Sequence, residues 1–98
     1  MILYEVTLDV EPSVSAEVEE HMRQHHIPAI FATGCFRRIR FQRASNGQFR
    51  TSYEAETPSQ LERYLRDYAA GFRAEFLTEF PRGVRVSRET WDDVDTWD

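Results

Sequence analysis

The stretch CFRRIRFQRASNGQFRTSYEAE, residues 35–56, decides the fold of this 98-residue chain. Apolar and polar side chains alternate in each of its halves, which is the pattern of a strand buried on one face. Asn46-Gly47 between the halves is the strongest short signal for a hairpin, because both residues tolerate positive φ. The stretch therefore predicts two antiparallel strands, over residues 35–43 and 48–56.

The two ends of the chain predict the remaining strands. Residues 1–10 alternate in the same way, and residues 84–91 form a fourth strand segment. An acidic tail follows over residues 92–98. The sequence therefore supplies four strands, two of them joined as the hairpin.

Two helices connect these strands. Apolar residues recur at helical spacing over residues 14–26, until Pro28 interrupts the pattern. The segment from Pro28 to Gly34 then suits one short extra turn of helix, which the glycine closes. Thr57 and Pro58 match an N-cap and first position of a second helix, whose apolar stripe extends to Phe76. The order is βαββαβ, which predicts an α+β, ferredoxin-like fold: one domain over residues 1–98, with both helices on one face of a four-stranded antiparallel sheet.

Strand alternation also assigns side chains to the sheet face that the helices leave open. The candidate residues for a ligand site or dimer interface on this face are Glu5, Phe36, Arg38, Arg40, Arg50, Glu54, Arg85 and Trp91. A solvated sheet face is normally polar throughout, so Leu3, Phe36 and Trp91 indicate that something covers it. A second copy of the sheet is the simplest cover, which would form a dimeric α/β barrel.

The arginines of this face allow two interpretations. In a dimer, they would pair with glutamates of the other copy, and we favour this interpretation because Glu5, Glu54 and Glu89 share the face. Alternatively, the arginines would form a pocket for a carboxylate or phosphate through bidentate hydrogen bonds.

Composition narrows the classes of partner. The net charge of -5 argues against a nucleic acid, whose phosphates need a basic surface. No apolar stretch is long enough for a spanning helix, and the first residues lack the basic start of a secretion signal. Cys35 is the only cysteine, which excludes an internal disulfide, favours a reducing compartment and suits inert packing. These features predict a cytoplasmic protein without a membrane or nucleic-acid partner.

The histidines are the main candidates for chemistry. His25 or His26 could act as acid or base at the barrel mouth, because imidazole titrates near neutrality. The structural alternative is a cationic ring that interacts favourably with the end of the helix dipole. Glu17, His21 and His25 follow at steps of four and could share a metal, but no third strong ligand is dictated by sequence. We therefore predict no metal site.

Several short segments together, and in their order, resemble the sequence of a known bacterial family. They are Met1-Ile2-Leu3-Tyr4-Glu5-Val6, His26-Ile27-Pro28, Ala32-Thr33-Gly34-Cys35-Phe36, Phe80-Pro81 and Ser87-Arg88-Glu89-Thr90-Trp91. With them the chain resembles, over almost its whole length, the bacterial family catalogued as domain of unknown function 4286. The resemblance implies a dimeric α/β barrel near the antibiotic-biosynthesis monooxygenase group, and no established activity. Haem-degrading members of that wider group use an Asn, Trp and His set, which cannot be mapped here because the only Asn is Asn46 in the hairpin turn.

Two functions remain open from the sequence. The first is a homodimeric barrel that binds a small anionic or organic molecule, or a protein, in its cleft. The alternative is a small enzyme of the oxygenase or isomerase type that works without a cofactor and moves protons through His25 or His26. Neither function calls for a cofactor or a metal.

Overall fold

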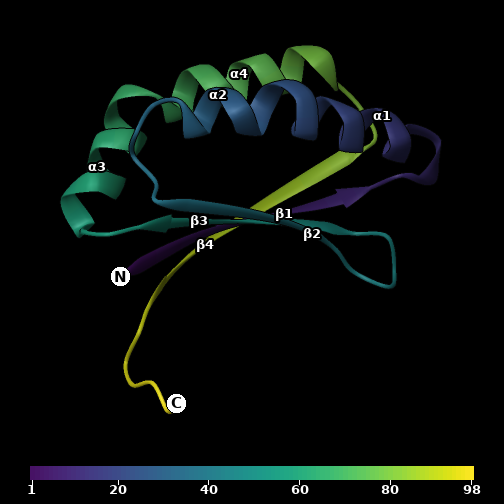
Figure 1. Cartoon of the computed structure of the whole chain (residues 1–98). Helices are drawn as coiled ribbons and strands as arrows, with labels where there is room; N and C mark the ends of the chain where they lie inside the picture. The colour runs from purple at the N-terminus through teal and green to yellow at the C-terminus, as the bar shows by residue number, and fades with distance from the viewer.

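The computed structural model describes all 98 residues and arranges them as a sheet covered by helices (Figure 1). The strands are β1 (Ile2–Val10), β2 (Arg38–Arg43), β3 (Phe49–Ala55) and β4 (Val84–Asp92). Their order across the sheet is β2-β3-β1-β4, and every neighbouring pair is antiparallel. This arrangement confirms the predicted ferredoxin-like fold.

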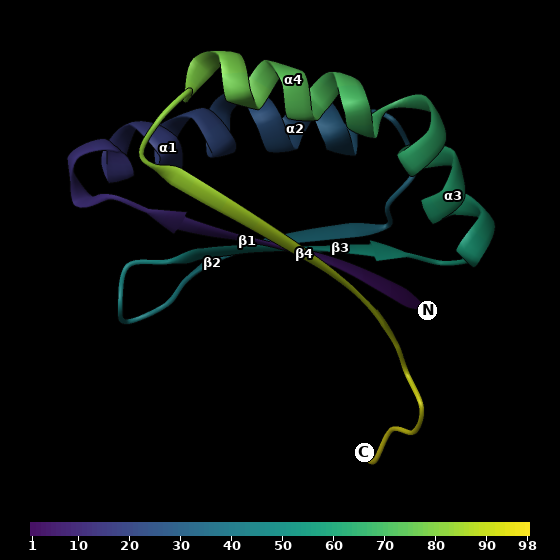
Figure 2. The same cartoon turned by 180° about the vertical axis from the view of Figure 1, so that it is seen from behind.

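The helical segments form two connections on the same side of the sheet. The first comprises η1 (Pro12–Val14), α1 (Ser15–His21), η2 (Met22–His26) and α2 (Ile27–Phe31), and the second comprises α3 (Pro58–Asp67) and α4 (Ala69–Glu79). Figures 1 and 2 show the helices above the sheet from both sides, with the opposite sheet face left open. None of the helices has the length and apolar composition of a membrane-spanning segment.

The first helical connection passes through Pro28: the extra turn predicted after it is present in α2, but the predicted interruption before it is wrong, because η2 leads directly into α2. The backbone N–H of Ile27 donates to the carbonyl of Met22, five residues earlier, which makes η2 a π-helical segment. Proline has no backbone N–H to donate, and its ring clashes with the carbonyl four residues before it. The wider π turn changes the hydrogen-bond register of the helix at that point. Residues five apart, such as His21 and His26, are thereby brought to one side of the helix.

The core lies between the helices and the alternate strand residues that face them. It forms two adjoining clusters, whose largest buried members are Tyr4, Phe36, Tyr53, Leu61 and Tyr64 in one, and Leu8, Met22, Phe49, Phe76 and Phe80 in the other. The expectation that Phe36 lies on the open face is therefore wrong. β2 begins only at Arg38, so strand alternation does not extend back to Phe36. The loop after α2 delivers its ring to the core, where it packs 5.1 Å from the Tyr53 ring, centroid to centroid.

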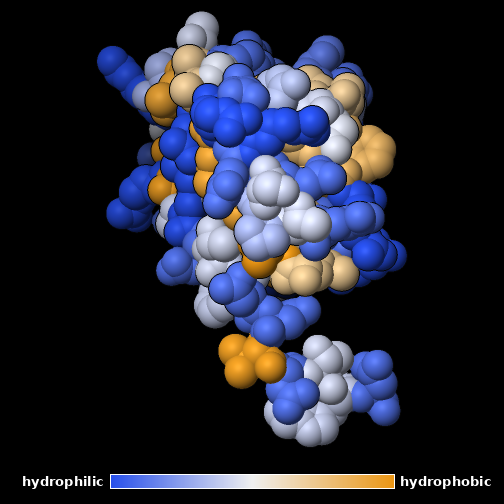
Figure 3. All heavy atoms as spheres, turned by 90° about the vertical axis from the view of Figure 1, so that its left-hand side faces the viewer, coloured by the Kyte–Doolittle hydropathy of each residue, from blue (hydrophilic) through white to orange (hydrophobic).

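The C-terminal segment leaves the sheet after β4. The tail stands clear of the body in Figure 3, with one strongly hydrophobic group near the body and hydrophilic or neutral atoms beyond it. Val94 is 99% exposed and Trp97 is 86% exposed, so neither packs on the chain. The acidic tail therefore begins one residue later than predicted, because Asp92 still belongs to β4.

Candidate functional site

A cavity of about 210 Å³ lies between the sheet and the helices. Residues of β1, β3 and β4 line it from the sheet side, and residues of η2, α2, α3 and α4 line it from the helix side. Of its 14 lining residues, 11 are hydrophobic, which is the composition of a site for a small organic molecule. An apolar cavity of about 150 Å³ is known to accept benzene, so this cavity has room for a single substituted ring.

Two arginines supply the positive charge of this cavity. Arg73 on α4 donates from Nη2 to the hydroxyl of Tyr4, at 3.2 Å. Arg88 on β4 lies opposite Val6 of β1, on the face that the helices cover. Both side chains are exposed and neither forms an ion pair within the chain, so no carboxylate of the chain neutralises either guanidinium group. No carboxylate lines the cavity.

Three tyrosines form the polar part of the buried lining. The rings of Tyr53 and Tyr64 lie 5.8 Å and 6.2 Å from the ring of Tyr4, centroid to centroid. Burial raises the pKa of both Tyr53 and Tyr64 above the ordinary value for a phenol. Their hydroxyls are therefore protonated at neutral pH, and they can donate hydrogen bonds but do not act as bases.

A cluster of two histidines and one glutamate adjoins the cavity. His21 Nε2 lies 2.9 Å from Glu75 Oε1, and His26 Nδ1 lies 3.1 Å from Glu75 Oε2. The two imidazoles are 10% and 11% exposed, whereas the Glu75 side chain is 47% exposed. Burial lowers the pKa of His26, and the neighbouring Glu75 offsets only part of this effect. We call this group the His21–His26–Glu75 cluster.

The structure separates the two histidines that the sequence proposes as acid or base. His26 lines the cavity, whereas His25 is exposed and lies outside it. The helical spacing of Glu17, His21 and His25 assumes an unbroken α-helix. The π segment brings the rings of both His25 and His26 beside His21, with centroids 5.7 Å and 6.2 Å away, but only His26 shares Glu75 with His21. The third member, Glu75, comes from α4 and is missed by any pattern within the first helix.

The other predicted site residues, apart from Phe36, lie on the open sheet face as expected. Several of them pair within the chain: Arg38 with Glu54 and Arg50 with Glu5, both at 3.9 Å, and Arg85 with Asp9 at 3.4 Å. Arg50 also donates to the side-chain oxygen of Gln42, at 2.8 Å. Arg40 forms no ion pair, and Trp91 is 52% exposed. The open face therefore carries paired charges beside an exposed aromatic ring.

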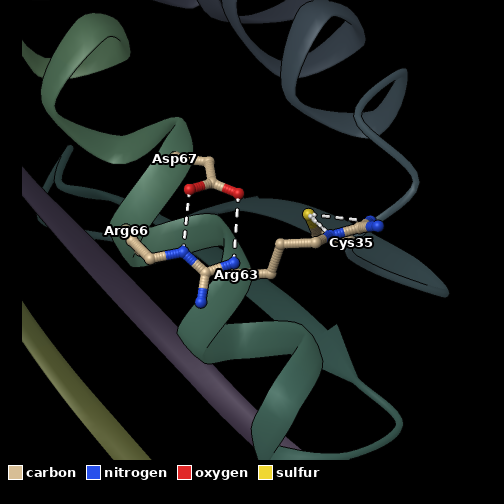
Figure 4. Close-up of polar contacts among 4 residues, drawn as sticks. All are labelled: Cys35, Arg63, Arg66 and Asp67. Carbon is tan, nitrogen blue, oxygen red and sulfur yellow. Dashed lines mark hydrogen bonds and ion pairs between the residues drawn. The ribbon is translucent and has the colours of Figure 1, made fainter.

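Cys35 has no place in the cavity. Its side chain is buried, and Arg63 of α3 contacts the sulfur with Nε at 3.4 Å and Nη2 at 3.2 Å (Figure 4). Arg63 Nη2 also donates to the carbonyl of Thr33, while Arg66 pairs with Asp67 on the same helix. These contacts fasten the loop after α2 to α3, which is the packing role expected for Cys35.

Sequence reasoning misses both cavity arginines. Arg88 could have been recognised from the sequence. It follows Val84 and Val86 on the face of β4 that the helices cover, where an unpaired charge is unusual. Arg73 leaves no such signal, because it occupies an ordinary position on the outer part of a helix. Its role depends on the packing of α4 against Tyr4.

Comparison with known families identifies the family of the chain. The family model described as "Domain of unknown function (DUF4286)" matches residues 1–94. The chain belongs to this family. No functionally curated protein matches it.

Solved structures share the fold of this DUF4286 protein at low sequence identity. A Deinococcus radiodurans protein, provisionally assigned as an antibiotic biosynthesis monooxygenase, superposes with a TM-score of 0.67 at 12% identity over 100% of this chain and 97% of its own. Rv0793 from Mycobacterium tuberculosis gives 0.65 at 11% identity over 100% of both chains. An ethyl tert-butyl ether D family protein from Bacillus halodurans gives 0.65 at 13% identity, over 96% of this chain and 100% of its own. These likenesses establish the fold.

Proposed function

We propose that this DUF4286 protein binds a small organic anion, a single-ring compound with a carboxylate or similar oxygen group, in the cavity between sheet and helices. One observation carries the proposal: an apolar cavity of about 210 Å³ has two unpaired arginines in its lining and no carboxylate. The ring would pack among the apolar side chains, while the anionic group would remain with Arg73 and Arg88. Such a division of apolar body and charged end is usual in small-molecule sites.

Tyr4 supports this arrangement. Its hydroxyl already accepts a hydrogen bond from Arg73, so the donor direction of the hydroxyl is free for an oxygen of the ligand. The contact also holds the guanidinium in place, which reduces the side-chain entropy lost when a ligand binds. Arg73 and Tyr4 would therefore act together on one oxygen group.

Benzoate and benzamide test the proposal, because they share a ring but only benzoate is charged. Hydrogen bonds to charged groups contribute about 1.5–3 kcal/mol, so benzoate should bind at least about tenfold more tightly in calorimetric titration. Arg73→Gln and Arg88→Gln should each weaken benzoate binding by about tenfold. Arg85→Gln, on the open face, is the matched control and should leave it unchanged. Equal binding of benzoate and benzamide would contradict the proposal.

We also propose that the protein is a homodimer that pairs through its open sheet face. Leu3 and Trp91 are register partners on β1 and β4, and Trp91 is 52% exposed. The strand positions of this face hold four arginines and four acids, so the face is balanced in charge and suits an identical copy. These residues are Arg38, Arg40, Arg50, Arg85, Glu5, Asp9, Glu54 and Glu89.

Light scattering of the intact chain checks the dimer. We expect a mass of twice the 11.6 kDa of one chain, and Trp91→Glu should shift it to the monomer, because a carboxylate would be buried against the partner. Trp97→Glu, in the exposed tail, is the control and should remain dimeric. A wild-type mass of 11.6 kDa at micromolar concentration would refute this assembly.

Proton-transfer catalysis is the second candidate function, and one observation favours it. His26 is the only histidine that lines the cavity, so its imidazole can reach a bound compound. Compounds that bind in the titration are incubated with the protein, and their products are followed by mass spectrometry. Turnover by wild type and His25→Ala, but not by His26→Ala, is expected of an enzyme of the isomerase or oxygenase type. Turnover that survives in His26→Ala would remove His26 from this role.

A further inference from the structure

We propose that the His21–His26–Glu75 cluster is a binding site for a divalent transition-metal cation of the zinc class, held between α4 and the adjoining segments α1 and η2. The inference is independent of the cavity ligand, although His26 belongs to both. Figures 1 and 2 show the two helical connections side by side above the sheet. The site lies at the junction of segments that are far apart in sequence, since His26 and Glu75 are 49 residues apart.

The donor atoms already have the spacing of a metal site. One ligand atom from each residue lies within 4.8 Å of the other two, and the two nitrogen–oxygen distances are 2.9 Å and 3.1 Å. In a tetrahedral zinc site with bonds of about 2.0–2.2 Å, neighbouring ligand atoms lie about 3.3 Å apart. A small movement of the exposed Glu75 side chain would therefore complete the geometry.

The ring nitrogen of His21 is the second observation. His21 Nε2 is buried and makes no hydrogen bond, although Glu75 Oε1 lies only 2.9 Å away. The oxygen therefore lies off the direction in which the ring nitrogen could donate or accept. A lone pair that does not face its neighbour is free to point at a bound cation. His26 Nδ1 and Glu75 Oε2 instead share a hydrogen bond at 3.1 Å, whose proton a cation would replace. A buried nitrogen without a partner is costly, and a bound cation would satisfy it.

The surroundings hold the two imidazoles in place. Phe80 packs edge-on against the ring of His21, with centroids 5.4 Å apart, and Phe76 packs in the same way against His26, at 5.5 Å. Aromatic packing around metal ligands limits solvent and fixes ring orientation. Glu75 has no arginine partner, and its ion-pair contacts are the two histidines alone. The carboxylate is thus available to a cation.

The donor set indicates which cation binds. Two imidazole nitrogens and one carboxylate suit zinc, iron(II), cobalt(II) or nickel(II), whereas magnesium and calcium prefer all-oxygen sites. Three protein ligands leave at least one coordination position for a solvent molecule or another ligand. A metal on His26 Nδ1 would also prevent that histidine from acting as a free base in the cavity.

Zinc and cobalt titration of the chelator-treated full chain, made without a histidine tag, tests the site. We expect one cation per chain, and a visible cobalt spectrum of low coordination number. Glu75→Gln should weaken zinc binding by about 100-fold or more, since loss of outer-shell partners alone costs about 10–100-fold. Glu79→Gln, a carboxylate one turn further along α4, and His25→Ala, the exposed neighbour of His26, are the controls and should bind zinc as wild type does. Zinc should raise the melting temperature of wild type but not of Glu75→Gln.

Three outcomes would overturn the proposal. These are the absence of saturable binding, equal affinity of Glu75→Gln and wild type, and loss of binding in His25→Ala. Glu75 is exposed, so its variant should fold, and His26→Ala serves as a second variant whose folding is verified by circular dichroism. Arg73→Gln tests the cavity separately: it should retain zinc binding even where benzoate binding is lost, so that failure of one proposal is distinguishable from failure of the other.

Discussion

Phe49→Ala should lower the free energy of unfolding by about 3–5 kcal/mol, the usual cost of removing a buried phenylalanine. Phe49 is 1% exposed and lies on β3 opposite Leu8 of β1, beneath the first helical connection. Its ring stacks on Phe41 with centroids 5.2 Å apart, and the Arg43 guanidinium lies over it at 5.5 Å. Loss of the ring would leave a void that these fixed neighbours cannot fill.

Urea unfolding at one fixed protein concentration measures this loss, because the proposed dimerisation would make stability concentration-dependent. Phe31→Ala is the matched control: that ring is 52% exposed on α2, so its removal should change stability by about 0.5 kcal/mol or less. Similar losses in the two variants would mean that Phe49 does not anchor the helices. The native β3 register would then need another explanation.

The fold is predictable from the sequence because its strongest signals are local. Asn46-Gly47 marks the hairpin, although only Gly47 has a positive φ, of 90°. The turn runs from Ala44 to Gly47, whose N–H donates to the Ala44 carbonyl at 3.0 Å. Thr57 caps α3 as predicted, since its hydroxyl accepts a hydrogen bond from the Gln60 backbone N–H at 3.3 Å. The error at Phe36 arose at a strand end, where alternation no longer constrains a side chain. Element boundaries depend on tertiary contacts, and these are absent from a local pattern.

The candidate site is less predictable, because it is produced by packing between distant segments. The cavity exists where α4 crosses the sheet, and sequence periodicity contains no information on how much space remains there. The His21–His26–Glu75 cluster depends on a π turn, which alters the helical repeat that spacing arguments assume. Arg88 alone could have been found, as a charge on the covered side of a strand. A polar residue that breaks a core pattern is thus the most useful pointer to a site in this fold.

Stability should fall steeply above about pH 10, the ordinary pKa of tyrosine, because the folded chain keeps buried phenols neutral. The pKa values of Tyr53 and Tyr64 are raised by burial, so above this pH the unfolded chain releases protons that the folded chain retains. Their stabilising effect is therefore fully present below the unfolded-state pKa and is lost as pH rises toward the folded-state values. Each tyrosine should contribute a loss of about 1.4 kcal/mol per pH unit in that window.

Urea unfolding between pH 8 and pH 11, with absorbance of the phenolate near 295 nm, measures this dependence. Tyr53→Phe removes one titrating group and should roughly halve the alkaline slope, whatever the variant does to stability at neutral pH. Tyr68→Phe is the matched control, since Tyr68 is 37% exposed and its loss should leave the slope as in wild type. A slope equal in Tyr53→Phe and Tyr68→Phe would show that Tyr53 ionises in the folded state. The cavity lining would then contain a phenolate above about pH 10, and binding of the proposed organic anion should weaken in that range.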